Sequence, residues 1–202
     1  MRAGPVRRAR TLAWLVVLGL GCTSVSGTTA VDAGLGSSVS LETVALQTGD
    51  SAPGFVLPLL NPAPIQPIAD THALELLALE SLRGKVVYVD FWDSACGPCR
   101  EALPALSGLR DQFARHDVEF VAVNLDPDPR AALRFLERYP VSYPVVSDPS
   151  GQSARNWGVQ ALPTAFLIGR DGVVHDMKRG FDVADIARIQ SKLTALAVGR
   201  KG

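Results

Sequence analysis

Residues 85–104, KVVYVDFWDSACGPCREALP, decide the fold of this chain. The run from Val86 to Trp92 is β-branched or aromatic at most positions, which predicts a short, fully buried strand. The strand pattern breaks at residues 93–95, and apolar residues then recur at steps of three and four. These residues are Leu103, Leu106, Leu109 and Phe113. The stretch therefore predicts a strand, a tight turn and a helix over roughly 97–115.

The turn delivers the segment Cys96-Gly97-Pro98-Cys99, so that Cys96 lies at the N-terminus of the expected helix. Unpaired N–H groups and the helix dipole favour an anion there, and a thiolate is such an anion. In a Cys-x-x-Cys setting the pKa of the thiol falls from about 8.5 to between roughly 3.5 and 7.5. We interpret the pair as redox-active. The alternative, a local structural staple, would add little stability because the closed loop is so short.

The bulk composition fits one ordinary domain with appendages. The chain has 202 residues and 47% hydrophobic content, enough for a proper core. Lysine plus arginine and aspartate plus glutamate both number 20. This charge balance gives no indication of a nucleic-acid partner, and none is expected.

The N-terminal residues 1–22 have the layout of a secretory signal. Four arginines precede an apolar run from Leu12 to Leu20, and small residues follow. The run is too short to span a hydrocarbon layer of ~30 Å, so a transmembrane anchor is the less favoured alternative. The residues before Cys22, Leu18-Gly19-Leu20-Gly21, resemble the lipobox of bacterial lipoproteins, although Gly19 stands where that motif has Leu. This resemblance implies a lipidated Cys22. Ordinary cleavage at a later small residue such as Gly27 is the alternative.

Loss or lipidation of Cys22 leaves Cys96 and Cys99 as the only free cysteines of the three in the chain. An exported protein with a single close pair has no disulfide scaffold to build. We therefore expect a bacterial protein of the periplasm or cell envelope, held by a lipid on a membrane that faces the periplasm.

The rest of the chain divides into a linker, a domain and a tail. Residues 23–47 are rich in Ser, Thr, Gly and Ala, which is typical of a flexible linker. The folded domain is expected over 48–198, with a tail at 199–202. A proline-rich stretch follows a short strand at 55–57, and residues 73–82 fit either a short helix or an edge hairpin.

Further elements follow the cysteine helix in a regular order. Expected strands cover 118–125, 143–146, 164–168 and 173–177, and expected helices cover 129–139, 154–157 and 183–198. Asp128 is the expected N-cap of the 129–139 helix, with Pro129 at its first position and Leu133 and Leu136 facing the core. Alternating strands and helices predict parallel pairing, and a turn at 170–172 predicts an antiparallel hairpin. The fold class is therefore α/β, with a mixed sheet between helices.

Three separated blocks resemble a known family. They are Gly84-Lys85-Val86-Val87 with Phe91-Trp92, Cys96-Gly97-Pro98-Cys99-Arg100 and Pro104; Trp157-Gly158-Val159-Gln160-Ala161-Leu162-Pro163-Thr164; and Phe166-Leu167-Ile168-Gly169-Arg170-Asp171-Gly172. In this order and spacing, the chain from about Thr48 to Val198 resembles the thioredoxin fold. Within that fold it resembles the exported TlpA/ResA-like thiol–disulfide oxidoreductases. The resemblance implies a three-layer α/β/α sandwich with a mixed central sheet.

The resemblance also implies residue roles. Cys96 would be the nucleophile and Cys99 the resolving thiol, joined as a disulfide in the oxidised state. Pro163 would be the family's cis-proline facing the pair, which would expose the Leu162 backbone to an extended partner peptide. A proline that merely starts a strand is the alternative. The remaining motif or substrate-facing residues would be Trp92, Gly97, Pro98 and Thr164.

Two positions depart from the family pattern. Ala95 replaces the Trp that usually precedes the first Cys. Many relatives carry Glu three residues after the second Cys, where this chain has Ala102; Glu101 is one position earlier, rotated about 100°. Asp90 occupies the place of the buried Asp of thioredoxins, where burial would raise its pKa and suit proton exchange with Cys99. A polar pocket or a water facing Asp90 is the alternative.

These observations predict an exported thiol–disulfide oxidoreductase, which we expect to reduce disulfides of partner proteins. Cys-Gly-Pro-Cys is shared with thioredoxin, whose potential is near −270 mV, and the family implies a membrane thiol-relay partner as electron donor. A non-catalytic binding module for a peptide or metal is the alternative. No cofactor is expected, and no metal either, since the Cys spacing is one residue short of the copper chaperones on this fold. Asp93 stands where peroxiredoxins need Thr, which argues against peroxidase chemistry.

Overall fold

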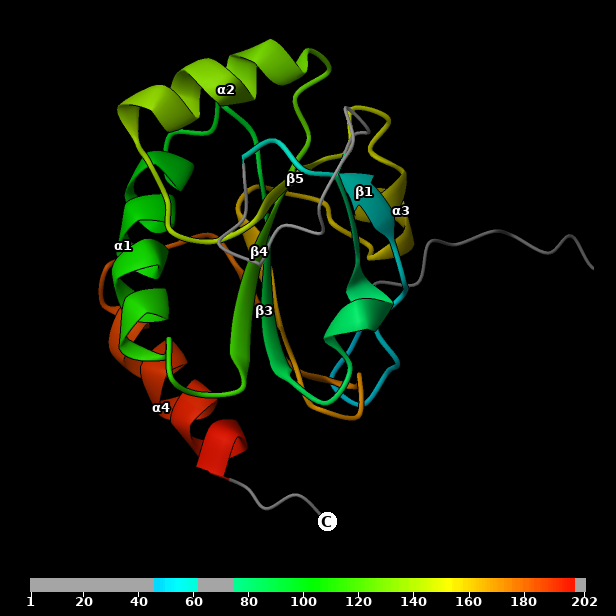
Figure 1. Ribbon diagram of the computed structural model, residues 1–202, viewed down its shortest axis with the longest axis vertical. Coiled ribbons are helices and arrows are strands. Elements are labelled where there is room, and N and C mark those ends of the chain that lie inside the picture. Colours follow the sequence, from blue (N-terminus) through cyan, green and yellow to red (C-terminus); the bar gives the residue numbers. More distant parts are fainter. Residues whose placement is uncertain (1–45, 62–74, 199–202) are drawn as a thin grey trace, which may run out of the picture. The chain divides into compact units, whose positions relative to one another are not determined.

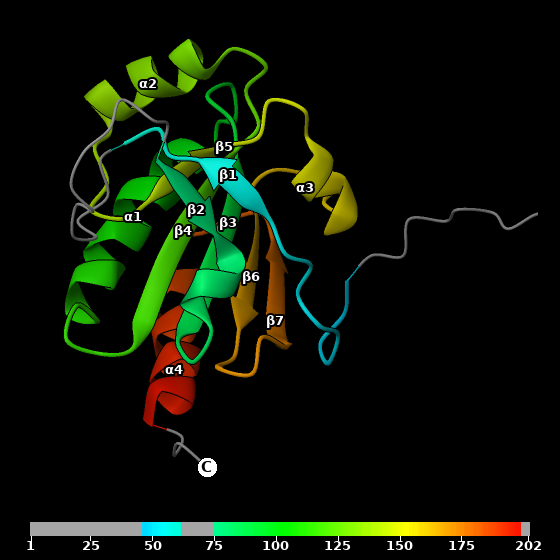
Figure 2. The same cartoon turned by 45° about the vertical axis from the view of Figure 1, so that its right-hand side comes forward.

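The computed structural model describes residues 46–61 and 75–198. A five-stranded mixed sheet forms its centre, in the order β5-β4-β3-β6-β7, and β1 and β2 form a separate two-stranded sheet. An isolated bridge between Leu59, directly after β1, and Val146 of β5 links the two sheets. Strands β3, β4 and β5 are parallel, while β6 pairs antiparallel with both β3 and β7 (Figure 2). The predicted thioredoxin-like α/β class is confirmed.

The elements have the following bounds. The strands are β1 (Val56–Pro58), β2 (Leu76–Ala78), β3 (Val86–Trp92), β4 (Val118–Asn124), β5 (Val145–Ser147), β6 (Thr164–Ile168) and β7 (Val174–Arg179). The helices are the 3-10 helix η1 (Leu79–Leu82), α1 (Cys99–Gln112), α2 (Pro129–Arg138), α3 (Gln152–Asn156) and α4 (Asp185–Val198).

Strand β3 separates two hydrophobic layers, and all seven of its residues are buried. Tyr88 and Trp92 point to the side covered by α1 and α4, which lie together on one face of the sheet in Figure 1. Val89 and Phe91 point to the opposite side, where they pack with the β1–β2 ribbon, η1 and α3. Burial on both faces explains why the strand is an unbroken apolar run except at Asp90.

The region 73–82 combines a strand with a helical turn. Its described part forms β2 followed by η1, and β2 pairs antiparallel with β1. The sequence left a short helix and an edge hairpin open as alternatives for this region. The structure has one part of each: a short 3-10 helix, η1, and a strand, β2, whose partner β1 precedes the region.

One core assignment in α2 was wrong. Leu133 is 40% exposed, whereas Ala132 and Phe135 are buried and Leu136 packs against the core. The buried stripe of α2 passes through Ala132, Phe135, Leu136 and Tyr139, at steps of three and four. Leu133 lies about 100° from Ala132 around the helix and so faces solvent.

The predicted signal segment with Cys22, the linker as far as residue 45, the proline-rich stretch beyond residue 61 and the tail at 199–202 lie outside the described residues. Leu46, which we assigned to the linker, is buried in the layer that contains Phe55 and Trp157. Among the helices within 46–61 and 75–198, none is long and apolar enough to cross a membrane.

Candidate active site

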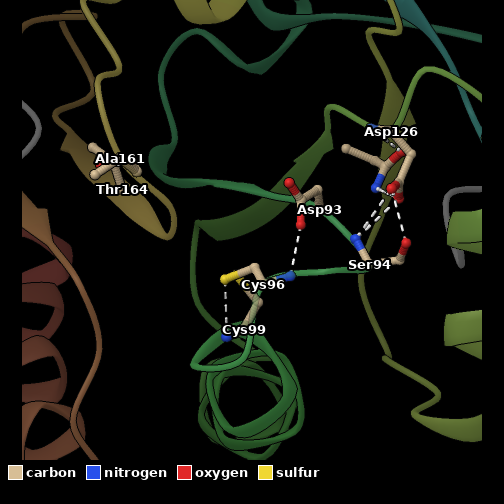
Figure 3. Close-up of a disulfide and its surroundings, with 8 residues drawn as sticks. Asp93, Ser94, Cys96, Cys99, Asp126, Ala161 and Thr164 are labelled. Carbon is tan, nitrogen blue, oxygen red and sulfur yellow. Dashed lines mark hydrogen bonds between the residues drawn. A yellow bond between two sulfur atoms is a disulfide. The ribbon is translucent and has the colours of Figure 1, made fainter.

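Cys96 and Cys99 form a disulfide at the start of α1, with their Cα atoms 5.3 Å apart (Figure 3). Cys99 is the first residue of the helix and is fully buried, whereas Cys96 precedes the cap residue Pro98 and is partly exposed. The backbone N–H of Cys99 donates a hydrogen bond to Sγ of Cys96 at 3.2 Å. An N–H group at a helix start thus already faces the sulfur that would carry negative charge after reduction.

The turn before Cys96 is held by two carboxylates, as Figure 3 shows. Oδ1 of Asp93 accepts the backbone N–H of Cys96 at 2.7 Å. Asp126 accepts both the backbone N–H of Ser94, at 3.0 Å, and its hydroxyl, at 2.8 Å. The amide of Asn124 donates to the same Asp126 carboxylate at 2.8 Å, and Asp126 is 7% exposed. The loop that presents Cys96 is therefore tied to the end of β4.

The opposite wall comes from the start of β6. The Leu162–Pro163 peptide bond is cis. Phe91 pairs with Thr164 in the antiparallel β3–β6 register, so the end of β3 and the start of β6 lie at the same edge of the sheet. The Pro163 carbonyl accepts the N–H of Gly180 at 2.7 Å, while the backbone of Leu162 makes no hydrogen bond within residues 46–61 and 75–198. Within the described residues, the unpaired backbone of Leu162 therefore lies at the end of the sheet where β3 leads to Cys96.

Asp90 is buried on the same face of β3 as Trp92 and is 3% exposed. That face is covered by α1 and contains Cys99. Its register neighbours are Ala122 on β4 and Ala165 on β6, which supply no charge. Burial raises the pKa of Asp90 from 3.8 to about 8, and Oδ2 has no hydrogen-bond partner within the described residues.

The charge of Asp90 affects the pKa of two buried tyrosines, Tyr88 and Tyr143. Burial first, and the Asp90 charge second, raise the pKa of Tyr143 well above 10. The pKa of Tyr88 is raised in the same way and for the same two leading reasons. The Asp90 charge therefore acts on both tyrosine hydroxyl groups, and both tyrosines belong to the hydrophobic layer under α1.

The other predicted motif residues divide into exposed and buried ones. Gly97 and Pro98 are exposed at the tip of the turn, and a Cβ atom added to Gly97 would meet nothing within 4 Å. Trp92 is fully buried against Phe135, with ring centroids 4.9 Å apart, and Thr164 is 1% exposed. These last two side chains support the site from within the core and do not face solvent.

Two further positions bear on the departures from the family pattern. Glu101 is exposed, and Ala102, the position where the family resemblance led us to expect Glu, is 1% exposed. Glu101 lies in the first turn of α1, where an exposed carboxylate is favoured by the helix dipole. Within the described residues, no group of three or more His, Cys, Asp or Glu side chains could hold a metal ion.

Sequence reasoning missed the residues that hold the turn, namely Asp93, Ser94, Asn124 and Asp126. A signal for the last two was available, because β3 and β4 are parallel and their carboxyl ends meet at one edge. Polar residues directly after two neighbouring parallel strands are expected to lie close together there.

The chain is similar to known proteins that carry out thiol–disulfide exchange. The Redoxin family model matches residues 47–193. The thiol-disulfide oxidoreductase ResA of Bacillus thuringiensis subsp. konkukian (strain 97-27) is 31% identical over 134 residues, which cover 66% of this chain and 70% of that protein. ResA of Bacillus subtilis (strain 168) is 34% identical over 129 residues, covering 64% and 65%.

A solved structure of similar sequence supports the same placement. The crystal structure of a thiol:disulfide interchange protein, DsbE, from Chlorobium tepidum aligns with a TM-score of 0.67 and 35% identity. The alignment covers 76% of this chain and 99% of that one. The part of the chain that the family model matches contains both Cys96 and Pro163.

Proposed function

Since the chain belongs to the Redoxin family and, within it, to the thiol–disulfide oxidoreductases of the TlpA/ResA type, we propose that it is an exported reductant of disulfides in partner proteins. The observation that carries this proposal is the unequal burial of the pair: Cys96 is partly exposed, and Cys99 is completely buried. One sulfur is thus accessible to a partner, and the other is protected until the first has reacted.

The reaction proceeds by two exchanges. In the reduced protein the Cys96 thiolate attacks one sulfur of the partner disulfide, forms a mixed disulfide and releases the other sulfur as a thiolate. The Cys99 thiolate then attacks Sγ of Cys96 and displaces the second partner sulfur. Two electrons pass from the protein dithiol to the partner, and the two protons lost by Cys96 and Cys99 are regained by the partner's thiols. The Cys99 N–H, 3.2 Å from Sγ of Cys96, stabilises the attacking thiolate.

Asp90 is the proton acceptor for Cys99 in the second exchange. Cys99 is fully buried, so its proton has no direct path to water. Asp90 lies on the face that α1 covers, and its pKa of about 8 lets it exchange a proton near neutral pH. In the reverse direction the protonated Asp90 returns the proton to the Cys99 thiolate.

The partner binds as an extended segment that pairs with the backbone of Leu162. The Leu162 backbone has no hydrogen-bond partner within the described residues and lies at the end of the sheet where β3 leads to Cys96. An extended peptide that pairs with this backbone would place its own disulfide over Cys96. The exposed Gly97 and Pro98 leave room for its approach.

The cell envelope is the proposed site of action. The basic and apolar N-terminal segment supports export, and Cys22 supports a lipid anchor. In an oxidising compartment the pair needs a supply of electrons, so a membrane thiol-relay protein is the proposed donor.

Trapping of a mixed disulfide tests this function and separates it from a binding module. The reduced protein should accelerate insulin reduction by dithiothreitol. The Cys99→Ser variant should form a stable mixed disulfide with insulin, visible on a non-reducing gel. The matched Cys96→Ser variant should form none, because its remaining thiol is buried. If both variants trap insulin equally, or the native protein fails to accelerate reduction, the proposal is wrong.

A further inference from the structure

Asp93 lies three residues before the nucleophile and contacts it directly. Its side-chain Oδ1 accepts the backbone N–H of Cys96 at 2.7 Å, and its own carbonyl lies 3.4 Å from the same nitrogen (Figure 3). The side chain is partly buried, so water screens its charge only in part. A carboxylate is therefore hydrogen-bonded to the backbone of the residue whose sulfur must become an anion.

We propose that Asp93 is a positioning residue which both fixes the Cys96 turn and disfavours the Cys96 thiolate, so that the pair becomes a stronger reductant. This inference deepens the proposed function and rests on it. A like charge within about 4–6 Å of an ionisable group disfavours its charged form. The reduced protein carries the thiolate and the disulfide does not, so the Asp93 charge destabilises only the reduced state.

Two contacts act on Cys96 in opposite directions. The Cys99 N–H donates to its sulfur at 3.2 Å and favours the thiolate, as does the helix start. The Asp93 carboxylate, bonded to the Cys96 N–H, opposes it. The sequence on its own shows only the first effect, because Asp93 could as well point into solvent.

Other charged groups around Cys96 are placed differently. The Asp126 carboxylate is occupied by three donors, two from Ser94 and one from Asn124. On α1, Arg100 and Glu101 are exposed, and Asp90 is buried on β3. The facing loop 158–163 contains no ionisable side chain. Asp93 is thus the one carboxylate within the described residues that bonds to the backbone of Cys96.

The expected effect follows from a balanced equilibrium with glutathione. One oxidised protein molecule and two glutathione thiols give one protein dithiol and one glutathione disulfide. If Asp93→Asn lowers the pKa of Cys96 by about one unit, the equilibrium constant for reduction rises about tenfold at pH values above the Cys96 pKa of the native protein. For a two-electron couple, tenfold corresponds to about 30 mV towards a less negative potential. The gain vanishes at pH values where Cys96 is protonated in both proteins.

The test measures both quantities in matched variants. The pH dependence of Cys96 alkylation by iodoacetamide is followed in a Cys99→Ser background, which leaves one thiol in the domain. The glutathione equilibrium is measured with both cysteines present. Asn keeps an oxygen that accepts the Cys96 N–H, so Asp93→Asn removes the charge and preserves the turn. Glu101→Gln removes one exposed charge from the first turn of α1 and serves as the control.

The expected result is a lower Cys96 pKa and a pH-dependent gain of the reduced form in Asp93→Asn, with a clearly smaller change in Glu101→Gln. Asp93→Ala should shift both quantities in the same direction. The inference is overturned if Asp93→Asn behaves like the native protein while only Asp93→Ala differs, because the role is then structural. It is also overturned if Glu101→Gln gives an equal shift. Neither measurement involves a partner protein, so a failure of insulin reduction is a separate result.

Discussion

Replacing Asp90 by Asn should remove a loss of folding stability that the native protein suffers as the pH rises from about 4 to about 8. Asp90 is 3% exposed, and burial raises its pKa from 3.8 to about 8. Because the folded-state value lies above the unfolded one, folding takes up a proton between these pH values. The contribution of Asp90 to stability is therefore fully present below about pH 4 and is lost as the pH rises to about 8.

The size of the effect follows from the shift. Each pH unit between the two pKa values costs 1.36 kcal/mol, so the native protein loses about 4 kcal/mol by pH 7. Asp90→Asn removes this loss but buries an amide without an assured partner, at a pH-independent cost of about 1–3 kcal/mol. The oxidised variant should therefore be more stable than the native protein at pH 7–8, with the advantage shrinking or reversing at pH 5.

Urea denaturation of the oxidised proteins at pH 5, 6, 7 and 8 measures this difference. The free-energy gap between variant and native protein should grow by about 1 kcal/mol per pH unit. Glu137→Gln, an exposed position on α2, should leave the slope unchanged. A gap that stays constant across this range would show that Asp90 does not take up a proton on folding. In the same variant, exchange at Cys99 should slow while alkylation of Cys96 stays nearly unchanged, and equal effects on both thiols would contradict the acid–base role.

Two further substitutions test the supports of the site. Asp126→Ala leaves the Ser94 N–H and the Asn124 amide without their buried acceptor, and should lower the free energy of unfolding by about 2–4 kcal/mol in urea; a change below about 0.5 kcal/mol would mean that water replaces the carboxylate. Asp128→Ala removes the side-chain cap that accepts the Arg130 N–H at 3.1 Å at the start of α2, and should cost about 1 kcal/mol by the same measurement, with no change in Cys96 alkylation.

The strands and the cysteine helix were predictable because their signals are local. The apolar run of β3, the periodic leucines of α1 and the Asp128-Pro129 start of α2 each fix an element without knowledge of the fold. The order of these elements then fixes parallel pairing for β3–β5 and a hairpin for β6 and β7. The disulfide pair could be located for the same reason.

The remaining features depend on contacts between distant segments. The inward face of α2 was misjudged at Leu133 because its neighbours, and not its own hydrophobicity, determine which stripe is buried. The hydrogen bonds from Ser94 to Asp126 join residues far apart in the sequence. They depend on the register of β3 and β4, which brings the ends of the two strands side by side. Asp93 and Cys96 are close in the sequence, but their contact depends on the side-chain rotamer of Asp93, which no residue pattern specifies.

The antiparallel pairing of β3 with β6 has a consequence for how the protein is made. Cys96 follows β3 closely, but Pro163 and β6 are synthesised much later, with α1, β4, α2, β5 and α3 in between. A nascent chain therefore displays its dithiol long before the wall opposite it exists. Until the C-terminal third has emerged and folded, these sulfurs should react like those of an unstructured peptide, without the selectivity that the finished sheet edge provides.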